Sequence, residues 1–61
     1  MTSEIPTNQS KRVLIVDDEA TIRTVLQAQI KHLGHQTTTA SNGKEAFQIL
    51  QSQSFDLIIS D

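Results

Sequence analysis

Two short, mostly aliphatic runs that each lead directly into acidic residues constrain the fold of this chain most. The run Val13–Val16 precedes Asp17–Glu19, and the run Leu57–Ser60 precedes Asp61. A strand without alternation of polar and apolar residues is typical of the interior of a sheet that helices cover on both faces. We therefore predict two neighbouring buried strands, the first over residues 11–16, that carry carboxylates at their carboxyl ends.

The segment that follows the first acidic residues has the periodicity of a helix. Its apolar residues fall on one face at 3.6 residues per turn, and they are Ile22, Val25, Leu26, Ile30 and Leu33. Asp18 or Glu19 is placed to cap the start of this helix, and Gly34 suits the left-handed position after its end. We therefore predict a helix from about Ala20 to Leu33.

A second strand and a second helix come next. The segment Gln36–Ala40 contains three consecutive threonines, which favour a strand at the edge of a sheet over one at its centre. Asn42 and Glu45 have the spacing of a capping box and predict a helix from about Gly43 to Gln53. Both phenylalanines are assigned to the core, because no basic patch accompanies them as it would in a binding surface.

The predicted order of elements is β-α-β-α-β, which indicates an α/β fold with a doubly wound parallel sheet. Helices that join parallel strands form right-handed crossovers, so the polar strand belongs at an edge and the spatial order is 2-1-3. The carboxyl ends of strands 1 and 3 then lie together, at the kind of position where ligands bind in open α/β sheets. Because a bare apolar edge is unfavourable, we expect further strands to belong beyond Asp61.

Composition excludes several classes of protein. A chain of 61 residues allows at most one small domain, and without cysteine it can form no disulfide or thiolate metal site. The net charge of −2 gives no electrostatic basis for binding nucleic acid or an anionic membrane. No apolar run approaches the roughly 20 residues of a membrane span. Residues 1–10 are polar and aperiodic, and we predict a disordered leader there.

The acidic residues predict a magnesium site. Mg²⁺ is usually held by one or two carboxylates together with phosphate oxygens, and Asp17, Asp18 and Asp61 can supply those carboxylates. The metal would offset the repulsion between them and let an anionic phosphoryl group approach. A carboxylate can then attack phosphorus to form an acyl phosphate, and we predict that Asp61 is this nucleophile.

Several motifs in order also resemble a known family. They are Val13 to Glu19, Arg23, Leu33-Gly34-His35, Ala40 to Ala46, and Phe55 to Asp61. Together they are similar to the first half of a response-regulator receiver domain, over about residues 11–61. The resemblance implies a flavodoxin-like sheet of strand order 2-1-3-4-5, of which this chain holds the first three strands.

In that family a histidine kinase or a phosphotransfer protein donates a phosphoryl group to an aspartate, and Mg²⁺ is required. The resemblance therefore implies Asp61 as phosphoacceptor, Asp17 and Asp18 as Mg²⁺ ligands with it, and a cytoplasmic signalling switch rather than a metabolic enzyme. The family also holds the phosphoryl oxygens with a hydroxyl and a lysine from its fourth and fifth strands. This sequence does not contain those positions, so we expect weak Mg²⁺ binding and little phosphorylation of the chain by itself.

A non-catalytic role is the alternative. The chain could complete its sheet by pairing the third strand with a partner or with a second copy, and its folding would then depend on concentration. Other Mg²⁺-dependent phosphoryl-transfer domains fit less well. Haloacid-dehalogenase-like and Toprim-like domains need Asp-x-Asp after a strand, which neither Asp17–Glu19 nor Ile59–Asp61 provides.

Overall fold

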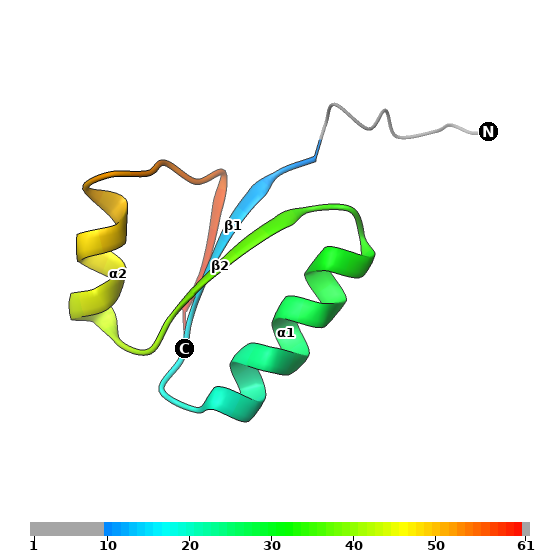
Figure 1. Cartoon of the computed structure of the whole chain (residues 1–61), viewed down its shortest axis with the longest axis horizontal. Coiled ribbons are helices and arrows are strands. Elements are labelled where there is room, and N and C mark those ends of the chain that lie inside the picture. Colours follow the sequence, from blue (N-terminus) through cyan, green and yellow to red (C-terminus); the bar gives the residue numbers. More distant parts are fainter. Residues whose placement is uncertain (1–9, 61) are drawn as a thin grey trace.

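The computed structural model describes residues 10–60, which form a parallel sheet with one helix on each side (Figure 1). The elements, in chain order, are β1 (Arg12–Val16), α1 (Ala20–His32), β2 (Gln36–Ala40), α2 (Gly43–Leu50) and β3 (Leu57–Ser60). Asp61 and all but the last residue of the predicted leader over residues 1–10 lie outside the described residues. In the described part of the chain, no helix has the length and apolar character to cross a membrane.

β1 is the central strand and pairs in parallel with both of its neighbours. The sheet has the order β2-β1-β3, which confirms the predicted 2-1-3 order and α/β fold. In this register Val16 lies opposite Ala40 on one side and Ser60 on the other. The three strands therefore end at the same edge of the sheet, and the threonine-rich β2 is an edge strand, as its composition predicts.

The core is small and is centred on β1. Val13, Leu14 and Ile15 are at most 1% exposed, and full burial of an aliphatic side chain stabilises a fold by roughly 1.5–3 kcal/mol. Successive side chains of a strand face opposite sides of the sheet. Leu14 packs with Ala40 and Ala46 on the side of α2, whereas Val13 borders a cavity with Ile30 of α1. β1 is thus covered on both faces, as its unbroken apolar sequence predicts.

The end of α1 is closed by Gly34. Its φ of 94° is in the left-handed region, which a residue with a Cβ atom adopts at a cost. The N–H of Gly34 donates to the Lys31 carbonyl at 2.9 Å, and the N–H of His35 donates to the Ile30 carbonyl at 3.3 Å. This pair of hydrogen bonds is the Schellman motif, and it confirms the predicted role of the glycine.

The start of α1 differs from the prediction. Glu19 is the N-cap residue, but its side chain makes no capping hydrogen bond. Instead, Asp17 Oδ1 accepts from the Glu19 N–H at 2.9 Å. A short acidic side chain can bond to the backbone two residues further on, so Asp17 orders the turn before the helix. The capping hydrogen bond predicted from the side chain of the N-cap residue is not formed.

The apolar face of α1 is less covered than its periodicity predicts. No residue of this helix is buried, and the side chains of Ile22, Val25 and Leu33 are 40%, 51% and 68% exposed. In the described part of the chain, α1 packs on β1 and β2. Three strands do not offer enough surface to cover the whole apolar stripe of the helix.

α2 begins at the predicted capping box, with one variation. Asn42 Oδ1 accepts from the Glu45 N–H at 2.8 Å. The Glu45 carboxylate accepts from the N–H of Ser41 at 2.5 Å and from its hydroxyl at 3.0 Å, so it bonds one residue before the N-cap. The expected reciprocal pattern is therefore confirmed in type and displaced by one residue.

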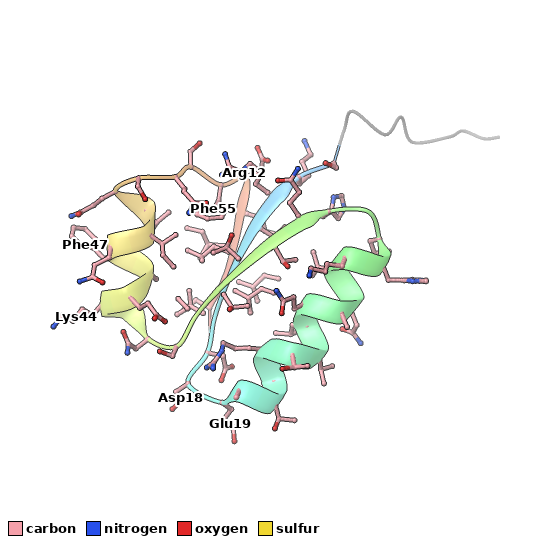
Figure 2. The ribbon with its side chains drawn as sticks, viewed as in Figure 1. Arg12, Asp18, Glu19, Lys44, Phe47 and Phe55 are labelled. Carbon is pink, nitrogen blue, oxygen red and sulfur yellow. The ribbon has the colours of Figure 1, made fainter. Side chains whose placement is uncertain are left out.

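α2 ends three residues earlier than predicted and leaves one phenylalanine in solvent. The N–H groups of Gln51 and Ser52 donate to carbonyls three residues back, those of Gln48 and Ile49, at 3.3 and 3.1 Å. Such bonds tighten the last turn and close the helix. Phe55 packs against the core as predicted. Phe47 is 64% exposed and lies on the side of α2 away from the sheet (Figure 2), so its assignment to the core was wrong.

Acidification is expected to weaken the start of α2. Hydrogen bonds from the Ser41 N–H and hydroxyl, with the nearby Arg23 charge, hold the pKa of Glu45 below its ordinary value of 4.5. Between the ordinary pKa and the lower pKa of Glu45 in the folded chain, the unfolded chain binds more protons than the folded chain. The stabilisation by the ionised Glu45 is therefore complete above about pH 4.5, and it is lost as the pH falls through the lower folded pKa. Urea unfolding followed by circular dichroism should show a smaller loss of stability on acidification in Glu45→Gln than in the parent chain.

Glu19→Gln is the matched control, since the Glu19 side chain makes no capping bond. It should retain the acid sensitivity of the parent chain. Equal pH profiles for Glu45→Gln and Glu19→Gln would contradict the assigned cap.

Candidate functional site

The segment Asp17–Glu19, which we call the acidic loop, connects β1 to α1. Asp17 is half-buried, and Asp18 and Glu19 are exposed. Figure 2 shows Asp18 and Glu19 at the turn from β1 into α1, at the end of the sheet opposite to Arg12 and Phe55. The acidic loop therefore lies at the carboxyl end of the central strand, where ligands bind in open α/β sheets.

Three hydrogen bonds hold Asp17 in place, and each comes from a different part of the fold. Its N–H donates to the Ala40 carbonyl of β2 at 3.1 Å. Its Oδ1 accepts from the Glu19 N–H at 2.9 Å, and its carbonyl oxygen accepts from Arg23 Nη1 of α1 at 2.6 Å. The acidic loop is thus tied to β2, to itself and to α1.

A cavity of about 290 Å³ opens beside the acidic loop. Its lining comes from the carboxyl ends of β1 and β3, from the acidic loop, and from the turn after β2 with the start of α2: Val16, Asp17, Asp18, Ser41, Asn42, Gly43 and Ser60. The structure therefore brings the ends of β1 and β3 together, as predicted. The sequence identified Ser41–Gly43 only as a turn and helix start. Their place after a parallel strand was the signal that they reach the same edge of the sheet.

The side-chain atoms in this cavity that could bind a metal are carboxylate oxygens, and these suit a small hard cation. Asp17 Oδ1 accepts one backbone hydrogen bond, which leaves its other carboxylate oxygen for a ligand. Asp18 is exposed at the mouth of the cavity, and carboxylate oxygens suit Mg²⁺. Within residues 10–60, no three His, Asp or Glu side chains are grouped to hold a metal. The third predicted ligand, Asp61, lies outside the described residues.

A larger cavity, about 510 Å³, lies at the other end of the sheet between α1 and the starts of β1 and β3. Its lining is mostly apolar, and its one carboxylate is already engaged. Asp56 Oδ2 accepts from the Arg12 N–H at 2.9 Å, while the Asp56 N–H donates to the Arg12 carbonyl at 2.8 Å. These bonds align β3 with β1, so the carboxylate at this end of the sheet has a structural role.

Comparison with known proteins identifies the family. The family model of the response regulator receiver domain matches residues 13–61. The chain is 48% identical over 60 residues to "Probable transcriptional regulator ycf27" of Cyanidium caldarium, covering 93% of this chain and 24% of that protein. It is 40% identical over 52 residues to the alkaline phosphatase synthesis transcriptional regulatory protein PhoP of Bacillus subtilis, covering 85% and 22%.

A third relative has a different overall organisation. The chain is 42% identical over 50 residues to hybrid signal transduction histidine kinase F of Dictyostelium discoideum, covering 82% of this chain and 4% of that protein. The chain thus spans about a quarter or less of the length of these three curated relatives. The extent of the family match, over most of the chain, and the sheet order and acidic loop agree: this chain belongs to the family of response regulator receiver domains.

Proposed function

We propose that this chain takes a phosphoryl group from a histidine kinase or a phosphotransfer protein onto Asp61, with Mg²⁺ held by Asp17, Asp18 and Asp61. The family assignment supports a phosphoacceptor role in two-component signalling. The observation that carries the proposal is the cavity in which Asp17 and Asp18 of the β1 end adjoin Ser60, the residue before Asp61. In this role the chain acts in the cytoplasm as a switch and not as a metabolic enzyme.

The chain's own groups have distinct parts in this step. A carboxylate oxygen of Asp61 attacks phosphorus, the bond from phosphorus to the donor imidazole nitrogen breaks, and the electron pair of that bond stays on the nitrogen. Asp17 and Asp18 would hold the cation, Asp17 through the carboxylate oxygen that its bond from the Glu19 N–H leaves free. When bound, Mg²⁺ offsets the charge that develops on the phosphoryl oxygens.

The composition of the cavity limits what these groups can achieve. Among the described residues that line it, two are acidic and none is basic. Electrostatic stabilisation of a transferring phosphoryl group usually comes from arginine, lysine or a metal. The acyl phosphate is therefore expected to accumulate little. Mg²⁺ is expected to bind weakly for a different reason, since only two carboxylates of the described residues adjoin the cavity.

Asp18→Asn tests the metal site. It removes one ligand charge, and we expect the dissociation constant for Mg²⁺ to rise by about tenfold or more, as a loss of roughly 1.4 kcal/mol or more would give. The measurement is a ¹⁵N–¹H correlation spectrum titrated with Mg²⁺. Glu19→Gln removes the same charge one residue further on and should change the constant much less. Equal effects of the two substitutions would show that Mg²⁺ senses only net charge.

Phosphorylation by acetyl phosphate tests the phosphoacceptor. With Mg²⁺ present, intact-mass measurement should detect a small, substoichiometric gain of one phosphoryl group. Asp61→Asn or chelation of the metal should abolish the gain, because either change removes a required group. A stoichiometric gain would contradict the expected weakness of the site, and a gain that survives in Asp61→Asn would contradict the assigned nucleophile.

The outer edge of β3 supports a second candidate function, in which this strand pairs with a partner or a second copy. In the described part of the chain β3 pairs only with β1, and Leu57 and Ile58 are 52% and 48% exposed. Exposed apolar edge strands pair with other chains. Sedimentation and circular dichroism at increasing protein concentration should then show association and increasing order together. Unchanged mass and ellipticity over a hundredfold range of concentration would exclude self-pairing.

A further inference from the structure

The Arg23 side chain bonds to the main chain of the acidic loop and not to one of its carboxylates. Arg23 is half-buried in the first turns of α1. Its backbone N–H donates to the Glu19 carbonyl at 3.1 Å, and its Nη1 donates to the Asp17 carbonyl at 2.6 Å. The bond to Glu19 is the ordinary first hydrogen bond of the helix, so the side-chain bond to the Asp17 carbonyl is the contact that is particular to Arg23.

The hydrogen bond from the Arg23 side chain leaves the carboxylate oxygens of the proposed metal ligands free. Arg23 bonds to a main-chain oxygen, so this contact uses no lone pair of the Asp17 or Asp18 carboxylate. The Asp17 carbonyl belongs to the peptide group that joins Asp17 to Asp18. The N–H of Asp17 is also bonded, to the Ala40 carbonyl. The backbone is therefore fixed on both sides of Asp17, the residue before the exposed Asp18.

We infer that Arg23 is the positioning residue of the magnesium site, and this rests on the proposed function. It sets the direction in which the two carboxylates leave the acidic loop. Mg²⁺ demands nearly ideal octahedral geometry with short bonds, whereas Ca²⁺ accepts irregular geometry and a variable number of oxygens. By fixing the acidic loop, Arg23 makes the site selective for Mg²⁺ over Ca²⁺.

Arg23→Gln separates positioning from charge and from folding. Loss of a nearby positive charge would strengthen the binding of both cations by the same factor, and partial unfolding would weaken both equally. Loss of positioning should instead lower the ratio of Mg²⁺ to Ca²⁺ affinity by about tenfold, the scale of effects seen when partners of metal ligands are removed. Both affinities are measured by titration in ¹⁵N–¹H correlation spectra, with the amides of Val13–Ile15 reporting whether the core is intact.

Two further variants complete the test. Arg23→Lys keeps the charge and one donor group, so it should restore part of the affinity ratio. Lys31→Gln removes the same charge from the last turn of α1 and should leave the ratio unchanged. If Arg23→Gln loses the core signals, Arg23→Lys decides: a lowered ratio supports the inference and an unchanged ratio overturns it.

The outcomes distinguish this inference from the proposed function. A parent chain that binds neither cation would overturn both. A parent chain that binds Mg²⁺, together with an Arg23→Gln variant that alters both affinities by the same factor, would overturn only the role of Arg23. A lowered ratio with an intact core, partly restored by lysine, is the result that we expect.

Discussion

The structure depends on the pairing of β1 with a parallel strand on each side. Three buried aliphatic residues, Val13–Ile15, make this strand the centre of the core, and its register sets Val16 opposite both Ala40 and Ser60. Because all three strands run in the same direction, the segments that follow them emerge at one edge. The acidic loop, the turn after β2 and the end of β3 meet there as a consequence of the pairing, and the bond from the Asp17 N–H to the Ala40 carbonyl adds to it.

Backbone hydrogen bonds organise the acidic edge and leave its carboxylates available. The Asp17 backbone is bonded to β2 and to Arg23, and Glu45 fixes the turn after β2 through Ser41. The described polar contacts thus set the shape of the cavity, while charged oxygens of Asp17 and Asp18 remain for a cation. This division suits a signalling site, where an anionic group must be able to approach and the surrounding backbone must keep its shape.

Much of this arrangement could be predicted from the sequence, since it follows from period, composition and order. The unbroken apolar run of β1, the threonines of β2 and Gly34 each have one physical interpretation, and the structure agrees with all three. Tertiary detail was less accessible. Phe47 is apolar yet faces solvent, because α2 presents Ala46 and Ile49 to the sheet instead. Periodicity alone places both sets of residues in the same broad stripe.

The candidate site was also predicted only in part, because the contacts that orient its residues are tertiary. Two carboxylates at the end of an apolar strand are visible in any such sequence, whereas the partners that orient them are not. Arg23 is four residues after Glu19, and its motif and its place in the first turns of a helix were apparent. That its guanidinium turns back to a main-chain oxygen of Asp17 depends on the path of the acidic loop, which no local pattern specifies.

Three separate segments, namely the acidic loop, the turn after β2 and the end of β3, line one acidic pocket. A ¹⁵N–¹H correlation spectrum of the chain, titrated with Mg²⁺ and then with beryllofluoride as a mimic of a phosphoryl group, tests this arrangement most directly. We expect shifts confined to the acidic loop, to Ser41–Gly43 and to Ser60 and Asp61, with the signals of Arg12 and Phe55 at the opposite edge unmoved. Shifts in only one of these segments, or at the opposite edge, would contradict it.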